Sequence, residues 1–479
     1  MTEPRWQSPL SGRYASPEML RLWSEPYRIG QWRRVWLALA EAERELGIAI
    51  PDEAIAEIRA HLDDADLQRA AEHEKRLRHD VMAHVHAFGE QAPAARPWLH
   101  LGATSAFVTD NADGLIIRDG LRLLLGRLLT VAEALGGFAK KNADIPCLAY
   151  THFQPAQLTT VGKRATLWAQ DFALDIEAML QLLDGWRLRG CKGTTGTQAS
   201  FLELFAGDHA KVRRLEQRVA ELLGHPRVFP VSGQTYTRKA DSQVLDVLSG
   251  IAQSAAKFAN DIRLLQHEGE LLEPFEKDQI GSSAMAYKRN PMRSERIGAL
   301  ARHVISLQQN TANTAATQWL ERTLDDSANR RLTLPEAFLT TDAILLLAAN
   351  IASGLEVRLG VIRRHVENQM PYMATERWLM LGVQAGGDRQ ELHEVIRRHS
   401  LTVAAETAEG ADNTLMERLA SDPAFAAVDR DRLKAELDPA RYTGRASTQV
   451  GEFLGEYFEP LLERARPHSV AAAPGELRV

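Results

Sequence analysis

The sequence predicts a mainly α fold, with a central bundle of long helices and smaller helical regions on either side. Two observations support this prediction. Apolar residues recur in a seven-residue pattern over several long segments, and no long stretch alternates apolar and polar residues as a β-strand would. The composition is that of a globular protein, since 45% of the 479 residues are hydrophobic and 25% are charged.

The first long helix is expected over residues 117–138, where apolar residues lie alternately four and three apart. The same spacing nearly recurs over residues 165–186, recurs fully over 244–265 and continues over 297–307. The apolar segment 337–357 predicts a fifth helix. A repeat of about 3.5 residues is typical of helices that pack nearly parallel. The apolar positions of the first helix are Ile117, Leu121, Leu124, Leu128, Val131, Leu135 and Phe138.

Several of these helices should be longer than about 25 residues, or about 40 Å. Helices of that length extend beyond the core of a compact monomer, so we expect a rod-like bundle covered by other subunits. At about 150 residues per domain, the length suggests about three domains. We predict an N-terminal helical domain (1–104), a central long-helix bundle (105–357) and a C-terminal helical domain (358–479).

Composition excludes several classes of protein. Lys and Arg number 57 and Asp and Glu 63, a net charge of −6, which argues against a protein that coats nucleic acid. The two cysteines, Cys147 and Cys191, exclude a disulfide framework and a Cys-rich zinc site. No signal peptide is visible, and the longest uncharged apolar stretch, 343–355, is too short to span a bilayer. We therefore expect a soluble, cytoplasmic protein with no nucleic-acid or membrane partner.

Two polar segments place histidines beside other functional groups. In the first, residues 78–80 (Arg-His-Asp), a helix would put His79 and His86 on one face. A metal site there needs a third ligand that the sequence does not supply nearby, so no metal is predicted and ordinary surface histidines are the alternative. In the second, His152 stands at a junction between a loop and a helix, where it could act as a general acid. A helix-capping or hydrogen-bonded structural histidine is the alternative.

Two glycine-containing segments suit loops with a function. Residues 192–198 (Lys-Gly-Thr-Thr-Gly-Thr-Gln) suit a turn that cradles an anion, although they lack the spacing of a P-loop. Residues 279–291 form a polar, glycine-hinged loop that fits a mobile catalytic lid. Within it, Asn290 is expected to be the N-cap and Pro291 the first residue of the next helix.

A further segment, residues 321–331, holds three arginines, a serine and an asparagine. Guanidinium groups bind planar anions through paired hydrogen bonds, so this set suits a phosphate or carboxylate clamp. Salt bridges to Asp325 and Asp326 are the alternative interpretation.

These segments resemble a known family. The pattern Ser282-Ser283-x-Met285-x-x-Lys288-x-Asn290-Pro291 resembles the signature loop of the fumarase/aspartase superfamily, whose central domain is a bundle of five long helices. Within that superfamily the chain is most similar to the adenylosuccinate lyase family of animals. The similarity runs from residues 11–15 to residues 443–447, through segments 151–157, 192–198, 234–239 and 322–331.

The resemblance implies a β-elimination that releases fumarate from adenylosuccinate, giving AMP, and from SAICAR, giving AICAR, in purine nucleotide biosynthesis. It implies no cofactor. By resemblance, Ser282 takes a proton, Lys288 helps to activate Ser282, His152 protonates the departing nitrogen and His79 supports His152. A serine hydroxyl is a very weak acid, so it has to be activated by neighbouring cations and N–H donors.

The resemblance also implies that each site is assembled from three chains of a homotetramer. This agrees with helices too long for the core of a single chain. The implied substrate contacts are Arg13, Tyr14, Arg78, Asp80, Thr104, Ser105, Gln234, Asn290, Arg296, Arg322, Ser327 and Arg331.

One position departs from the family pattern, because Ala286 stands where the loop usually has proline. Losing a proline raises the entropy of the open loop by about 0.4–1 kcal/mol, so we expect a less preorganised loop and unchanged chemistry. One alternative is a sister lyase such as argininosuccinate lyase or aspartase, or an enzyme acting on another N-succinyl compound, although the arginines favour a phosphorylated substrate. Another is a non-catalytic helical scaffold, and a third is a metalloenzyme built on His79, Asp80, His84 and His86.

Overall fold

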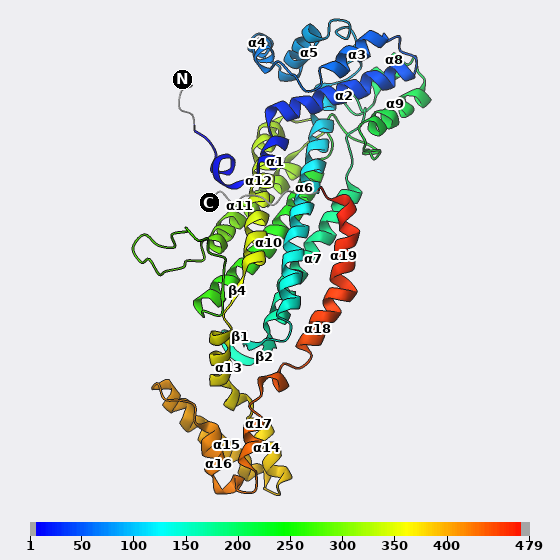
Figure 1. Cartoon of the computed structure of the whole chain (residues 1–479). Helices are drawn as coiled ribbons and strands as arrows, with labels where there is room; N and C mark the ends of the chain where they lie inside the picture. Colours follow the sequence, from blue (N-terminus) through cyan, green and yellow to red (C-terminus); the bar gives the residue numbers. More distant parts are fainter. Residues whose placement is uncertain (1–5, 471–479) are drawn as a thin grey trace.

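Five long helices form a rod, as the sequence predicts (Figure 1). The computed structural model describes residues 6–470. In the rod, α10 packs on α11, α11 on α12, α12 on α6 and α6 on α7. The expected apolar positions are buried along its axis, with Leu121, Leu128 and Leu135 fully inaccessible to solvent. The five helices are α6 (Ser105–Lys141), α7 (Val161–Gly185), α10 (Lys239–His267), α11 (Met292–Thr317) and α12 (Asp325–Gly354).

At one end of the rod a second hydrophobic cluster joins the N-terminal helices to a segment from the middle of the chain. Trp36 and Phe88 lie in its centre with Phe201, Leu215 and Val219. The elements of this end are α2 (Glu25–Glu45), α3 (Asp52–Ala60), α4 (Leu67–Leu77), α5 (Asp80–Gln91), α8 (Ala199–Leu204) and α9 (His209–Leu222). Two shorter elements precede them, η1 (Leu10–Tyr14) and α1 (Pro17–Leu22), and Met19 and Leu22 of α1 belong to the main core of the rod.

At the other end, a third cluster is formed by short helices around Trp378 and Phe425, after which the chain returns along the rod (Figure 1). Leu454, Phe458 and Leu461 of this returning segment belong to the main core. Residues 199–222 thus pack with the N-terminal helices, and the returning segment packs on the rod. The predicted domain boundaries at residues 104 and 357 stay a prediction. The elements are α13 (Leu359–Met373), α14 (Thr375–Gln384), α15 (Arg389–Ala408), α16 (Leu415–Ser421), η2 (Pro423–Phe425), α17 (Arg430–Ala435), η3 (Pro439–Tyr442), α18 (Ala446–Glu452), η4 (Phe453–Phe458), α19 (Glu459–Ala465) and η5 (Arg466–His468).

A β-hairpin, which the sequence did not predict, connects α6 to α7. Its strands are β1 (Pro146–Thr151) and β2 (Gln154–Thr160), and a second, two-residue ladder pairs β3 (Leu271–Leu272) with β4 (Glu356–Val357). Pro155 and three exposed neighbours interrupt any alternating pattern in β2, so the hairpin has no strand signal in the sequence.

Among the described residues, one helix, α12, is long and apolar enough to cross a membrane by length and composition. In the structure 72% of its apolar window is buried inside the molecule. Burial of that kind is typical of a core helix.

Candidate active site

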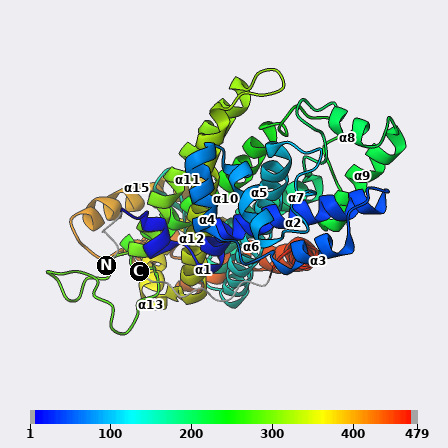
Figure 2. The ribbon, with the colours of Figure 1, turned by 90° about the horizontal axis from the view of Figure 1, so that it is seen from above.

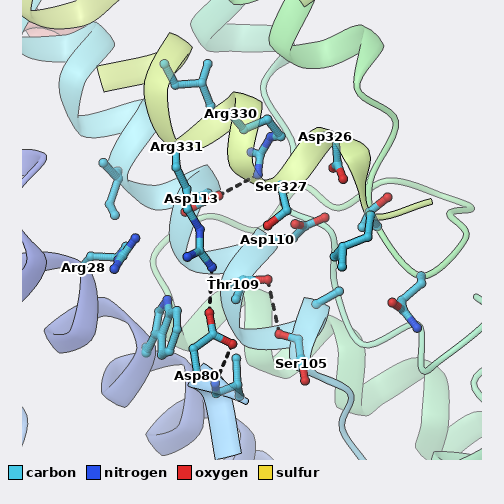
Figure 3. A pocket seen from close by; sticks show the side chains of 18 of the residues that line it. Arg28, Asp80, Ser105, Thr109, Asp110, Asp113, Asp326, Ser327, Arg330 and Arg331 are labelled. Carbon is cyan, nitrogen blue, oxygen red and sulfur yellow. Dashed lines mark hydrogen bonds and ion pairs between the residues drawn. The ribbon is translucent and has the colours of Figure 1, made fainter. Parts of the chain in front are cut away.

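A cavity of about 590 Å³ opens where the N-terminal ends of α5, α6 and α12 meet (Figure 3). Predicted site residues from four separate parts of the sequence line it. Together they make an open, polar and cation-rich chamber at one end of the rod. They are Arg78, His79, Asp80, Thr104, Ser105, Gln234, Arg322, Ser327 and Arg331.

A sharp turn between α4 and α5 presents three of these side chains. Arg78 ends α4 in the left-handed conformation at φ 55°, and His79 is the N-cap of α5. The Nδ1 atom of His79 accepts from the Met82 amide at 3.3 Å, and its Nε2 lies 3.3 Å from the Ser105 hydroxyl. The expected shared helix face of His79 and His86 is therefore wrong, because His79 precedes the helix.

Nothing in this region makes a metal site. His86 stacks on His73 with ring centres 5.5 Å apart, and His84 packs edge-on against Trp32. Burial lowers the pKa of His84 to about 4. Among the described residues no group of three potential ligands could hold a metal ion.

An ion pair crosses the cavity between α5 and α12. Arg331 donates to Asp80 at 2.7 Å, as Figure 3 shows. Burial acts to raise the pKa of Asp80, but hydrogen bonds from Arg331 and the Val81 amide outweigh it and lower that pKa. The two predicted substrate contacts therefore bind each other.

A chain of buried ion pairs holds the Arg322 side chain in place. Arg322 donates to one oxygen of Asp326 at 2.7 Å, and Arg238 donates to the other oxygen at 2.7 Å. Arg238 in turn forms a forked pair with Asp110, at 3.1 and 3.2 Å. Burial would raise the pKa of Asp110, but the charges of Arg238 and Arg330 lower it.

Arg330 also lines the cavity, but its guanidinium is held by the protein's own side chains rather than left to bind an anion. Its guanidinium donates to Asp241 and to the Tyr236 hydroxyl, both at 2.7 Å, and to Asp113 at 2.9 Å. Sequence reasoning missed this network of buried Arg and Asp residues. Two signals in the sequence pointed to it: the segment 234–239, quoted for its resemblance to the family, and the alternative of salt bridges to Asp325 and Asp326, which the Arg322–Asp326 pair confirms for Asp326.

Another predicted group lies outside the cavity. The guanidinium carbons of Arg13 and Arg296 lie 5.9 and 5.8 Å from the ring centre of Tyr14. These residues come from η1 and α11, and none of the three lines the cavity.

The loop between α10 and α11 carries Ser282 and Lys288 away from the rod (Figures 1 and 2). The Ser282 hydroxyl accepts from the amides of Ala284 and Met285 at 3.3 and 3.2 Å. The expected capping role of Asn290 is wrong: its side chain donates to the Gly281 carbonyl at 2.8 Å, and α11 begins at Met292, after Pro291.

His152 stands in the turn of the β1–β2 hairpin, and the expected loop-to-helix junction is wrong. His152 and Phe153 have φ values of 52° and 59°, as a two-residue type I′ turn requires. Both side chains are exposed. Helix α7 begins nine residues later, capped by Thr160.

Buried side chains anchor the base of this hairpin to the end of α10. The Glu270 carboxylate lies 2.9 Å from His365 of α13 and 3.7 Å from Arg164 of α7. Arg164 also donates to the Leu148 carbonyl on β1. Glu270 therefore ties the hairpin and α13 to the residues that lead into the loop carrying Ser282.

The cavity and the hairpin are at opposite ends of the rod. Ser105 begins α6 at the cavity, and β1 starts five residues after α6 ends at Lys141. Helix α6 has 37 residues, or about 55 Å at about 1.5 Å per residue. His152 of one chain therefore does not reach the cavity of the same chain.

The glycine-rich turn at 192–198, expected to cradle an anion, packs instead against other parts of the protein. Lys192 is buried and donates to Glu216 at 2.7 Å. Gly196 has φ 84°, and a Cβ there would lie 1.8 Å from the Ser232 carbonyl oxygen, so no other residue fits. This turn supports the edge of the cavity, because Gln234 donates to the Thr194 carbonyl at 3.1 Å.

Comparison with known proteins identifies the family. A family model described as lyase matches residues 24–306, and one described as adenylosuccinate lyase C-terminus matches residues 371–453. Adenylosuccinate lyase of Saccharomyces cerevisiae is 51% identical over 453 residues, covering 94% of each chain. The chain belongs to the adenylosuccinate lyase family. It is therefore a lyase, and the resemblance seen in the sequence is confirmed.

More distant relatives agree with this assignment. Adenylosuccinate lyase of Caenorhabditis briggsae is 41% identical, with 98% of each chain covered. Among solved structures, the 3-carboxy-cis,cis-muconate lactonizing enzyme from Pseudomonas putida superposes with a TM-score of 0.81 at 25% identity, covering 96% of this chain and 99% of that one. A fumarate lyase from Mesorhizobium sp. BNC1 gives 0.78. The predicted fumarase/aspartase-like fold is confirmed.

Proposed function

We propose that this enzyme is a carbon–nitrogen lyase that releases fumarate from adenylosuccinate, giving AMP, and from SAICAR, giving AICAR, in purine nucleotide biosynthesis. The observation that carries the proposal is the cavity in which Arg78, Arg322 and Arg331 converge with Ser327. Three guanidinium groups and a hydroxyl suit a substrate with a phosphate and two carboxylates. The names of the relatives support the same substrate.

The elimination needs one base and one acid. We assign Ser282 as the group that takes the proton beside a carboxylate, leaving a doubly negative aci-carboxylate that Lys288 and Asn290 stabilise. The electron pair then forms the C=C bond of fumarate as the C–N bond breaks, and His152 protonates the departing nitrogen. His79, hydrogen-bonded to Ser105, supports the acid. These steps need no cofactor.

We propose that the site is shared among three chains of a homotetramer. The hairpin with His152, the loop with Ser282 and the cavity are separate within one chain, so a complete site requires contributions from other copies. Exposed leucines on the rod helices support such an assembly, because they are apolar groups with room for a partner: Leu167 and Leu174 on α7, Leu264 on α10 and Leu332 on α12. We place the enzyme in the cytoplasm, with no nucleic-acid or membrane partner.

Purified protein offered adenylosuccinate, SAICAR, argininosuccinate and aspartate separately tests the substrate. We expect fumarate from the first two. Fumarate from argininosuccinate or aspartate alone would indicate a sister lyase, and no fumarate from any of them would favour a non-catalytic scaffold.

Mixing two inactive variants tests the sharing of sites. His152→Ala and Ser282→Ala chains, dissociated and reassembled together, should regain activity, because some sites then receive an intact histidine and an intact serine from different chains. Each variant reassembled with itself is the control. A mixture as inactive as the controls would contradict shared sites.

A further inference from the structure

The loop that carries Ser282 is closed at its base by buried groups that the elimination itself does not use. The loop leaves the rod at Glu273, which is 3% exposed, and returns at Arg293 and Ser294, which are 6% and 0% exposed. Residues 283–288 between them are all exposed. The contrast between a buried base and an exposed tip points to a dedicated anchor.

The carboxylate of Glu273 caps the helix on the far side of the loop. One oxygen accepts from the Arg293 amide at 3.0 Å, and the other accepts from the Ser294 amide and hydroxyl, both at 3.0 Å. Helix α11 has no cap from its own preceding residue, since Pro291 provides no side-chain hydrogen bond. Glu273, which precedes the loop, therefore accepts hydrogen bonds from the free N–H groups in the first turn of α11, which follows the loop.

Two further side chains, Gln266 and Arg293, join the outgoing and returning sides of the loop. Gln266, near the end of α10, accepts from the Glu273 amide at 3.1 Å and donates to the Arg289 carbonyl at 2.8 Å. The Arg293 guanidinium donates to the Pro274 carbonyl at 2.7 Å and to Glu276 at 2.9 Å. Gln266 therefore bonds both sides of the loop at once, and Arg293, on the returning side, bonds the outgoing side.

A second constriction lies closer to the tip. Asn290 donates to the Gly281 carbonyl, and a Cβ on Gly281 would lie 2.0 Å from the Lys288 carbonyl oxygen. The backbones therefore cross in van der Waals contact, immediately before Ser282. The two sides of the loop are therefore in contact both here and at its base. These contacts restrict how Ser282 and Lys288 can move relative to the rod.

We propose that Glu273 is a positioning residue for the Ser282 loop: by capping α11 from the other side of the loop, with Gln266 bridging the two strands, it sets where Ser282 and Lys288 stand. This inference rests on the proposed function of those two residues. Glu273 is buried at the root and does not touch the substrate. Its loss should therefore lower turnover while leaving binding at the arginine-lined cavity intact.

Glu273→Gln is the direct test, because the amide keeps the size but turns an N–H group toward backbone donors. We expect kcat to fall about tenfold to a hundredfold with KM changed less than about threefold. Glu276→Gln is the matched control: it makes the same change at an exposed position, keeps an amide oxygen that can accept from Arg293, and should keep kcat within about twofold of the wild type. Equal losses in the two variants, or none in Glu273→Gln, would overturn the proposal.

Limited trypsin digestion gives a readout that needs no substrate. Cleavage after Lys277, Lys288 and Arg289 should be faster in Glu273→Gln than in the wild type and in Glu276→Gln, at equal helical circular dichroism. Unchanged cleavage would overturn the anchoring role even if wild-type protein proved inactive on every substrate offered. If Glu273→Gln does not fold, Gln266→Ala should show the same two effects more weakly; normal kcat and cleavage in that variant would overturn the proposal as well.

Discussion

Arg331 and Asp80, 251 residues apart in the chain, are joined by a 2.7 Å hydrogen bond across the cavity. Both are predicted to contact the substrate, so an anion entering the cavity meets an arginine that is already paired. In the proposed complex, the substrate phosphate would share Arg331 with Asp80 or displace Asp80 from it.

Arg331→Lys tests this pair. Lysine keeps the charge but loses the fork that can serve a carboxylate and a phosphate together, so we expect KM to rise about tenfold with a smaller effect on kcat. Steady-state kinetics with adenylosuccinate measures both values. Arg397→Lys, in an exposed pair with Glu394 on α15, is the control; an unchanged KM in Arg331→Lys would contradict a substrate contact.

Ser282→Ala and His152→Ala should each lower turnover about 10²–10⁴-fold, the usual contribution of a proton-transferring group. Both side chains stand in turns outside the helices, so the circular dichroism should not change. Ser283→Ala, at the neighbouring exposed position, is the matched control. A large loss in Ser283→Ala together with normal activity in Ser282→Ala would reassign the base.

Ala286→Pro tests the departure from the family's loop pattern. The Lys288 amide donates to the Met285 carbonyl at 3.0 Å, which makes Ala286 the second residue of a β-turn, where proline is favoured. We expect the substitution to lower the entropic cost of ordering the open loop by about 0.4–1 kcal/mol. The kcat should therefore stay the same or rise. A sharp fall in turnover would show that loop closure needs a conformation that proline forbids.

Glu43→Gln tests a buried carboxyl group in α2. Glu43 is fully inaccessible, its oxygens have no hydrogen-bond partner among the described residues, and burial raises its pKa to about 9. The folded state therefore holds a proton that the unfolded state has lost, so stability falls as pH rises from about 4.5 to about 9.

In Glu43→Gln this part of the pH dependence should disappear, so the variant should melt higher than the wild type at pH 8 and near it at pH 4. Thermal unfolding followed by circular dichroism measures the difference. Glu53→Gln, at an exposed position in α3, is the control. A wild type as stable at pH 8 as the Gln variant would mean that Glu43 is ionised at little cost.

The helices of the rod could be predicted because their cores repeat. Positions such as Leu121 and Leu128 follow a period that only a helix satisfies. The hairpin could not be predicted in this way, because β2 is exposed over Gln154–Gln157 and has no buried face to impose alternation. Its turn depends on positive φ at His152 and Phe153, two residues that are not typical of type I′ turns.

The cavity shows a similar division. Its lining residues Arg322, Ser327 and Arg331 were found from the resemblance to a family, since they stand in one recognisable segment. The buried relay from Arg322 through Asp326 and Arg238 to Asp110 joins three helices, and nothing in the spacing of residues 110, 238 and 326 indicates that they meet. Such contacts depend on how the helices cross.

The eight residues from Gln266 to Glu273 hold both the hairpin with His152 and the loop with Ser282, the two elements proposed to be catalytic. Glu270 anchors the hairpin through Arg164, while Gln266 and Glu273 anchor the loop. In an assembly where one chain lends its hairpin to one site and its loop to another, this common footing gives neighbouring sites a physical route to cooperativity. In that proposed assembly, closure of the Ser282 loop at one site would be transmitted through residues 266–273 to His152 at the next.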